Sequence, residues 1–426
     1  MNAEHGVVFR FGFVMMSLQG IKVLYISYDG MTDPLGRSQV IPYLKGLARQ
    51  GCDIHLLSVE KRKAYAKHHQ DVQLLLQADG IKWHPIFYRK SPPVIGTLLD
   101  IRELAELALT LFKKEEFSII HCRSYVSALI GLSLKRETDA KFLFDMRGFW
   151  IDERIEGGIW NARNPLFRAI IAYFRKKETE FFSEADFIIS LTQRAKNHIV
   201  EKLSHRPAST IAVIPCCVDL EHFDFNNQSV SHNDALAESL GVSKTDFVIS
   251  YLGALGTWYM LTDMLLFFKV LLSHKPDAKF LFITPETSEF VLSEAHRMGI
   301  PTDRILVRSA DRDEVPALVS LSKLSLCFVR PTYSKIASSP TKVAELLALG
   351  IPVICNKGVG DLDLHGDWRQ SGIKSTDLGE AGFEATLQEI DALMLVEKER
   401  IRRYAQANFS LEQGVLHYAE VYRKLL

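Results

Sequence analysis

Short apolar runs of strand-like composition alternate with helical stretches along almost the whole chain, and this alternation constrains the fold more than any other feature. In the first half such runs begin at Ile21, Cys52, Ile81, Phe117, Lys141, Asp186 and Thr210. A second series begins at Phe247, Lys279, Arg304, Leu324 and Ile351. Near-continuous apolar runs mark strands buried on both faces, so each series predicts a parallel sheet flanked by helices. Because no short-period repeat is present, the doubling indicates two similar doubly wound sheets in an α/β fold.

The length supports this division, because 426 residues exceed what one hydrophobic core usually serves. We expect an N-terminal extension over residues 1–20, a first domain over 21–215, a second domain over 216–396, and C-terminal helices over 397–426 that pack across both. The domain boundary falls near VIPCCVDLEHF and the polar, linker-like stretch that follows it. The extension carries an arginine within its short apolar patch and no clear cleavage site, so it does not read as a signal peptide.

Charge and cysteine usage narrow the possible partners and location. Lysine plus arginine equals aspartate plus glutamate at 51 each, so the chain has no net field that would draw it to nucleic acid. No apolar run approaches the ~20 residues of a transmembrane helix. The six cysteines lack C-x-x-C spacing, which favours a reduced, cytoplasmic protein over disulfides or a zinc site.

The segment Ser338–Asn356 predicts an anion-binding helix start that runs directly into a buried strand. Ser339 is the expected N-cap and Pro340 suits the first turn. A helix N-terminus offers unpaired N–H groups and a partial positive charge, and Lys342 adds a full charge in the first turn. As an exposed helix-start residue, Lys342 is expected to contribute little to stability.

Lys342 and Glu345 are three residues apart and share one helical face. A cation for phosphate and a carboxylate for hydroxyl groups in the same cleft would suit a nucleotide sugar. The alternative is an ordinary crossover helix that carries a solvated lysine and glutamate.

Other candidate residues follow strands directly, because ligands of doubly wound sheets bind outside the carboxyl ends of the strands. The loop with Gly30 and Gly36 would allow close backbone approach to a pyrophosphate, although it lacks the G-x-G-x-x-G dinucleotide fingerprint. Gly253, Gly256 and Thr257 repeat this strand–glycine–turn pattern in the second half. A plain tight turn is the alternative for these three residues.

Charged residues also gather after two strands of the first series. Arg308 ends a strand of the second series, where it would border a base pocket; an ordinary crossover segment is the alternative. The charged set is His121, Arg123, Asp145, Arg147, Asp152, Glu153 and Arg154. Convergence at one sheet edge favours a functional site, whereas the alternative is a structural ion-pair cluster in which Asp145 pairs with Arg147 or Arg154.

Three stretches carry a resemblance to the retaining, nucleotide-sugar-dependent glycosyltransferases of family four. They are VLYISYDGMTDPLGRSQVIPYLKGLARQGCDIHLLS, VIPCCVDLEHF and SSPTKVAELLALGIPVICNKGVGD, and DMRGFWIDER resembles a subgroup signature. The likeness spans Ile21–Leu426. It implies the GT-B fold, two facing Rossmann-like domains with a cleft between them. It also implies transfer of a sugar, with retention, from a nucleotide-diphosphate-sugar to a glycan or lipid-linked acceptor, in polysaccharide or glycoconjugate synthesis.

The resemblance also assigns roles. Glu345 matches the second glutamate of the family's paired-glutamate motif, which holds the donor ribose. The first glutamate would fall at Ala337, so Lys335, Ser338 or Ser339 is expected to shape that part of the pocket.

Two first-domain positions match less closely. Gly36 resembles the loop glycine near the donor diphosphate, and Asp145 aligns approximately with a histidine of several relatives. The expected catalytic residues are therefore Asp145, Arg147, Lys342 and Glu345. The expected donor contacts are Gly36, Gly253, Gly256, Thr257, Arg308, Lys335, Ser338, Ser339, Thr341, Lys342 and Glu345.

No D-x-D metal motif stands at a strand end, so a metal-independent reaction is expected in which lysine and arginine offset the charge of the leaving diphosphate. Two alternatives remain open: a non-hydrolysing nucleotide-sugar epimerase, and a catalytically inactive nucleotide-sugar-binding subunit, for which Ala337 is the best argument. An NAD-dependent dehydrogenase is weaker, since both glycine fingerprints are absent.

Two basic runs suggest weak peripheral contact with the inner membrane face, where a lipid-linked acceptor would be met. They are Lys61–His69 and Tyr88–Lys90, both after first-domain strands. A solvated basic loop is the alternative.

Overall fold

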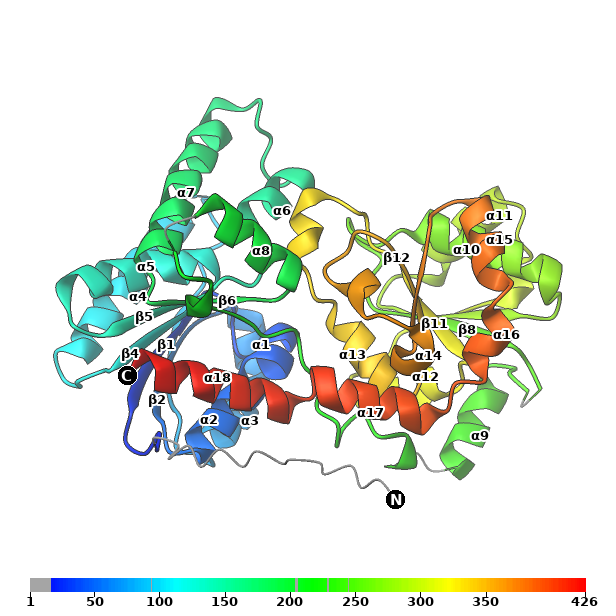
Figure 1. Ribbon diagram of the computed structural model, residues 1–426, viewed down its shortest axis with the longest axis horizontal. Helices are drawn as coiled ribbons and strands as arrows, with labels where there is room; N and C mark the ends of the chain where they lie inside the picture. Colours follow the sequence, from blue (N-terminus) through cyan, green and yellow to red (C-terminus); the bar gives the residue numbers. More distant parts are fainter. Residues whose placement is uncertain (1–16, 93, 204–205, 228–229, 244) are drawn as a thin grey trace, which may run out of the picture.

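The computed structural model describes residues 17–426 except 93, 204–205, 228–229 and 244, and it folds into two parallel sheets, each covered by helices on both faces (Figure 1). Residues 1–16 of the expected N-terminal extension lie outside the described residues. Among the described helices, none combines the length and apolar character needed to cross a membrane.

The first sheet has the strand order β3-β2-β1-β4-β5-β6-β7. Its strands are β1 (Lys22–Ser27), β2 (Asp53–Glu60), β3 (Lys82–Phe87), β4 (Ile119–Arg123), β5 (Lys141–Asp145), β6 (Phe187–Ser190) and β7 (Ile211–Val213). Alternate residues of a strand point to opposite faces, so Leu24 and Ile26 join the core on one side and Val23 and Tyr25 the core on the other. This two-sided burial explains the continuous apolar runs of the sequence.

The second sheet has the order β10-β9-β8-β11-β12-β13. Its strands are β8 (Val248–Leu252), β9 (Lys279–Ile283), β10 (Ile305–Arg308), β11 (Leu324–Cys327), β12 (Val353–Asn356) and β13 (Ile373–Thr376). The sequence pattern did not predict β13. Only Ile373 in this strand is apolar, and an edge strand pairs on one side alone. The polar stretch expected as a linker also contains a helix, α9 (Val230–Ser239), which contacts α12 (Val315–Ser320).

Helices connect successive strands in both domains, and α15 and α16 follow the last strand. In the first they are α1 (Pro34–Gln39), α2 (Ile41–Arg49), α3 (Arg62–Gln77), α4 (Ile95–Phe112), α5 (Ser124–Glu137), α6 (Trp150–Glu156), α7 (Pro165–Glu184), α8 (Gln193–Lys202) and the 3-10 turn η1 (Ala208–Thr210). In the second they are α10 (Leu261–His274), α11 (Ser288–Arg297), α13 (Thr341–Ala348), α14 (Trp368–Ser371), α15 (Glu380–Leu387) and α16 (Ile390–Met394), with the 3-10 turns η2 (Phe225–Asn227), η3 (Thr302–Arg304), η4 (Tyr333–Ala337) and η5 (Leu362–Leu364).

The chain ends with two helices that lie along both domains (Figure 1). Helix α17 (Lys398–Phe409) packs on α13 of the second domain, and α18 (Leu411–Leu425) packs on α2 of the first. Between them the backbone of 409–411 pairs with Val218, in the segment that links the two sheets: Val218 N donates to Phe409 O at 2.8 Å and Leu411 N donates to Val218 O at 2.9 Å. The two interdomain crossings therefore run side by side.

Each sheet reverses its strand order once, between β1 and β4 and between β8 and β11. In a doubly wound sheet the crevice outside the carboxyl ends at this point is where ligands bind. The fold therefore places the candidate site where these strand ends meet α13 and the loops of the opposite domain.

Candidate functional site

Lys342 is a buried ammonium in the first turn of α13. The residue is only 9% exposed, and its Nζ donates to the hydroxyl of Tyr251 at 3.1 Å. The same atom lies 3.5 Å from the ring centroid of Tyr259. Among the described residues no carboxylate lies within ion-pair distance of Nζ, and the Tyr251 hydroxyl is its one hydrogen-bond acceptor. Burial lowers the pKa of Lys342 to about 8.

Gly253 makes room for this ammonium at the carboxyl end of β8. Its φ is +114°, and a Cβ built there would meet Lys342 Nζ at 2.7 Å. Any other residue would therefore both strain the backbone and displace the lysine. The sequence pattern indicated only a glycine turn at Gly253. The structure shows that this glycine also leaves space for the Lys342 ammonium.

The start of α13 differs from the sequence-based expectation in its cap. Pro340 occupies the N-cap position, and the Ser339 hydroxyl instead accepts a hydrogen bond at 3.2 Å from Cys216 N, in the segment that links the two sheets. The backbone N–H groups of Thr341 and Lys342 have no acceptor among the described residues. With the cap absent, these two donors and the Lys342 ammonium are open to an anion.

Glu345 lies one turn further along α13 and pairs with Arg312 from the β10–α12 segment. The distance from Arg312 Nη1 to Glu345 Oε1 is 3.3 Å. Burial raises the pKa of Glu345, although Arg312 and Lys342 oppose the rise. Arg308, at the end of β10, is exposed and lies near Glu314, at 3.7 Å, rather than in this pair.

Lys335 has a partner and is not a free cation. In η4 its Nζ lies 2.6 Å from Glu153 Oε1 of α6, and 3.7 Å from the ring centroid of Trp258. Ser334 N also donates to the Glu156 carboxylate at 3.1 Å. The segment expected to contact the donor sugar is thus docked onto the first domain.

Ala337, at the end of η4, is fully buried and belongs to the hydrophobic core of the first domain. Thr192 Oγ1 of that domain donates to the neighbouring Ile336 O at 2.7 Å. An ionised glutamate at position 337 would be buried in this apolar contact, which gives a physical reason for alanine.

The loop before Gly36 is fixed from within the first domain. The buried Glu60 carboxylate accepts from Met31 N at 2.7 Å and from Thr32 N at 3.1 Å. A Cβ at Gly36 would meet Gly30 O at 2.2 Å, so this glycine lets α1 pack against its own loop. In the loop that the sequence suggested for a pyrophosphate, two N–H groups are therefore already hydrogen bonded. Glu60 was missed because nothing in its strand marks it as a residue that holds this loop.

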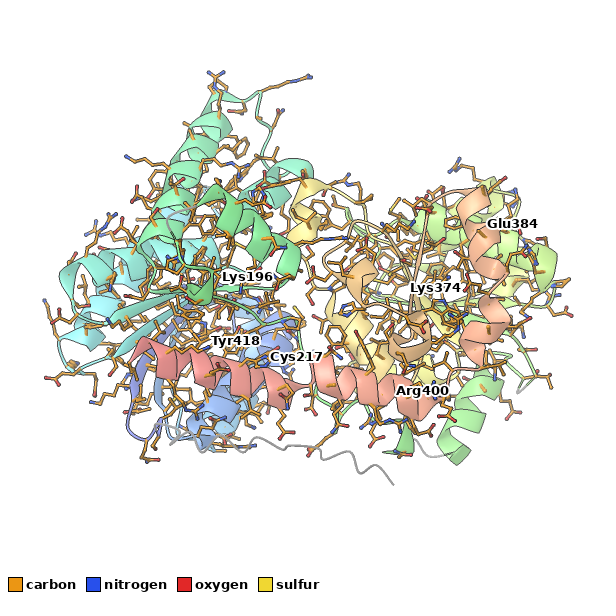
Figure 2. All side chains as sticks on the ribbon, viewed as in Figure 1. Lys196, Cys217, Lys374, Glu384, Arg400 and Tyr418 are labelled. Carbon is orange, nitrogen blue, oxygen red and sulfur yellow. The ribbon has the colours of Figure 1, made fainter. Side chains whose placement is uncertain are left out.

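Asp145 and Arg147 lie in a buried network under α18. Asp145 is 1% exposed, Tyr418 donates to its Oδ2 at 3.0 Å, and Arg147 Nη1 lies 3.8 Å from Oδ1. Tyr418 projects from α18 over the first domain (Figure 2). Burial alone would raise the pKa of Asp145, but Arg147, His121 and Arg123 together hold it below its ordinary value. This burial matches the structural ion-pair alternative raised from the sequence.

Two cavities lie near the residues described above. One of about 480 Å³ lies after β8, and its wall includes Thr257, Arg330 and the Tyr259 ring that contacts Lys342. The other, of about 200 Å³, lies between the domains and is lined in part by Ser338 and Ser339. Gly256 has open space around it, consistent with access from solvent. The larger cavity is within the size range of small-ligand pockets.

Sequence reasoning missed the groups that hold the site together. Tyr251 and Tyr259 surround Lys342, and Arg312 pairs with Glu345. Glu153 was in the charged set named from the sequence, but its pairing with Lys335 was not predicted. Tyr251 sits in an apolar strand run, where an aromatic residue reads as core. No group of three or more His, Cys, Asp or Glu side chains arranged for a metal ion was found within the described ranges.

Comparisons with known proteins bear on this geometry. The model of the Glycosyltransferase Family 4 family matches residues 40–222. The glycosyltransferase from Rickettsia africae ESF-5 is 18% identical, with a TM-score of 0.68 over 95% of this chain and 98% of that one. Anabaena Alr3699/HepE in complex with UDP and glucose is 15% identical, with a TM-score of 0.66 over 94% and 99%. The sucrose-phosphate synthase of Thermosynechococcus elongatus is 14% identical, with a TM-score of 0.68 over 95% and 99%.

These findings support a transferase of the glycosyltransferase type. The two-domain α/β architecture expected from the sequence is confirmed, and it matches that of GT-B glycosyltransferases. No curated protein matches this chain in sequence.

Proposed function

We propose that this protein transfers a sugar from a nucleotide-diphosphate-sugar to a glycan or lipid-linked acceptor, with retention of configuration, in polysaccharide or glycoconjugate synthesis. The observation that carries the proposal is Lys342. A buried ammonium that has one hydroxyl acceptor and no carboxylate partner is costly in free energy unless an anion binds to it. A donor diphosphate is such an anion, and the Anabaena neighbour binds UDP and glucose.

The residues of the α13 start can act on the leaving group. Lys342 Nζ and the free N–H groups of Thr341 and Lys342 would donate to the diphosphate, whose negative charge grows as the glycosidic bond breaks. Because the ammonium is already desolvated and held by Tyr251, it needs little reorganisation at the moment of reaction. Glu345 would accept hydrogen bonds from the ribose hydroxyls.

We also propose that the reaction needs no metal ion, since the charge of Lys342 and the α13 N-terminus would take the role of Mg²⁺. The test is activity in excess chelator. Retained activity supports the proposal, whereas loss that Mg²⁺ or Mn²⁺ restores contradicts it.

The first experiment is a thermal-shift screen of nucleoside diphosphates and nucleotide sugars on the wild type and on Lys342→Met. We expect stabilisation of the wild type by at least one nucleotide sugar and little stabilisation of the variant, because binding to the native state raises its melting temperature. The stabilising donor is then incubated with candidate acceptors, and released nucleoside diphosphate and the anomer of the product are measured by NMR. Conversion of the donor without acceptor would instead indicate an epimerase, and binding without transfer or hydrolysis an inactive subunit.

A cytoplasmic location is part of this proposal. Its support is the free, buried state of all six cysteines. The location is tested by fractionation of cells that express the tagged full chain.

A further inference from the structure

Residues 157–177 form an arm that stands out from the first domain: the α6–α7 loop and the first part of α7 (Figure 1). The base of the arm is fixed by aromatic packing. Trp160 lies 4.9 Å from Trp150 of α6, and 5.8 Å from Phe174 of α7, between ring centroids. The Asn164 side chain caps α7 by accepting from Leu166 N. The arm is therefore fixed at its base and projects in a defined direction.

The outer face of the arm is apolar. Leu166 is 55% exposed, Tyr173 49% and Ile159 55%. Leu166, Ala169 and Tyr173 follow one another at spacings of three and four, so they form one stripe on α7. The inward residues Phe174 and Phe181 are buried, so the stripe faces away from the core.

The charge of the arm has one sign. Residues 157–177 contain five basic residues and no aspartate or glutamate. Arg175 pairs with Asp152, and Lys177 pairs with Glu180. In the described part of the chain, Arg163, Arg168 and Lys176 have no ion-pair partner. An exposed apolar stripe flanked by unpaired cations is the pattern of a helix that lies in a membrane interface.

We propose that the α6–α7 arm docks on an anionic phospholipid surface, with Leu166 and Tyr173 in the interface and the three unpaired cations at the headgroups. The arm is a different surface from the basic runs at Lys61–His69 and Tyr88–Lys90. Charge complementarity favours a lipid surface over a second copy of this chain, because two copies of the arm would repel each other.

The arm adjoins the site that the proposed function uses. It continues from α6, whose Glu153 and Glu156 contact η4 of the second domain. Docking would therefore hold the cleft next to the bilayer, where a lipid-linked acceptor is met. The benefit of docking for the acceptor rests on the proposed function, but the docking itself is tested separately.

The experiment is flotation of the full chain with vesicles of phosphatidylcholine containing phosphatidylglycerol, compared with phosphatidylcholine alone, at low and high salt. We expect binding to the anionic vesicles that high salt reverses. Each cation near an anionic surface contributes roughly a five-fold gain in partitioning, so the triple variant Arg163→Gln, Arg168→Gln, Lys176→Gln should bind roughly 100-fold more weakly. Leu166→Gln with Tyr173→Gln should also reduce binding.

Two matched controls accompany these variants. Leu395→Gln removes an 84% exposed leucine from the second domain and should leave binding unchanged. The triple variant Lys63→Gln, Lys67→Gln, Lys90→Gln removes the same charge from the other basic surface and should also bind as the wild type.

Three outcomes would overturn the inference: no salt-sensitive binding by the wild type, equal loss in the second triple variant, or self-association without vesicles that the arm variants abolish. Thermal shift with the nucleotide sugar separates the two proposals. If the wild type binds the nucleotide sugar but not the vesicles, only the docking proposal is rejected. If the wild type does not bind any nucleotide sugar, the proposed function is rejected.

Discussion

At the scale of single residues, Lys342 combines a cost in stability with a proposed role in binding. The sequence placed it on an exposed helix start, where its removal should matter little for folding. That expectation was wrong, because Tyr251, Tyr259 and Gly253 bury the side chain. A buried cation without a counter-charge destabilises the unliganded fold, and an anionic ligand relieves that penalty.

Lys342→Met should therefore lower kcat/KM and raise stability together. A charge-assisted hydrogen bond is worth about 1.5–3 kcal/mol, which corresponds to a decrease in kcat/KM of roughly one to two orders of magnitude. At neutral pH the unliganded variant should be more stable by on the order of 2 kcal/mol, because the desolvated charge is gone. Steady-state kinetics and urea unfolding measure the two effects. Unchanged kcat/KM would remove Lys342 from the diphosphate site.

The pH dependence of stability follows from the same residue. Burial lowers the pKa of Lys342 from 10.5 to about 8, so between these values the unfolded chain binds the proton that the folded chain has lost. Unfolding free energy should therefore rise with pH from about 8 to 10.5 relative to Lys342→Met, and the penalty should be complete below 8. Donor affinity should change in the opposite sense and fall as pH rises through 8, which calorimetry at a series of pH values tests.

Glu345→Gln should weaken donor binding, because an amide replaces an ionised acceptor for the ribose hydroxyls. The substitution should cost little stability, because the ion pair that it removes is with an exposed arginine, Arg312. The measurement is titration with the best nucleoside diphosphate and with its 2′,3′-dideoxy form. The variant should lose affinity for the first and little for the second; equal loss for both would mean that Glu345 does not contact the ribose.

At the scale of elements, η4 of the second domain packs against helices of the first domain. Its side chains and backbone reach α6 and α8 through Lys335, Ser334 and Tyr333, whose hydroxyl lies 2.7 Å from His198 Nε2. The family resemblance implies that a glutamate at the end of this segment contacts the donor sugar. In this protein η4 packs against the first domain, and a carboxylate at position 337 would have no partner there.

Ala337→Glu tests this role. If the missing glutamate were a defect of an inactive subunit, restoring it would raise transfer or donor binding. We expect instead a loss of stability of about 3 kcal/mol or more, because an unpaired charge enters the first-domain core, with no gain in activity. Ala337→Val, a control for added volume, should cost less. Chemical denaturation and a donor-dependent activity assay measure the outcome.

At the scale of the whole molecule, the C-terminal helices join the domains and complete the first core. Side chains of α18, among them Val415 and Tyr422, belong to the core beside the first sheet, although they are almost 400 residues from its first strand. The same helix supplies the hydroxyl that binds Asp145. The state of that carboxylate therefore depends on the chain end being in place.

Asp145→Asn and Tyr418→Phe should behave alike. Both change a buried hydrogen bond to a charged group, worth about 1.5–3 kcal/mol, so both should lower unfolding free energy while leaving nucleotide affinity intact. Thermal unfolding and nucleotide titration on the two variants give the comparison. A selective loss of transfer in Asp145→Asn, with normal stability and with Tyr418→Phe unaffected, would return Asp145 to a catalytic role.

Local pattern was sufficient for much of this molecule. The apolar runs placed the twelve strands expected from the sequence, because a strand buried on both faces must be apolar throughout. Glycines and strand ends pointed to the loops after β8 and before α13, since backbone freedom and helix dipoles are local properties. The short polar edge strand β13 and the cap of α13 fell outside what such patterns specify.

Only the tertiary structure decided which charges are available. Lys335 and Lys342 look alike in the sequence, yet the first meets a carboxylate from the other domain and the second meets two aromatic rings. Asp145 and Glu345 likewise differ through partners that lie 273 and 33 residues away. Burial and pairing depend on segments that are distant in the chain and converge only in the fold, and these set the free energy of each charge.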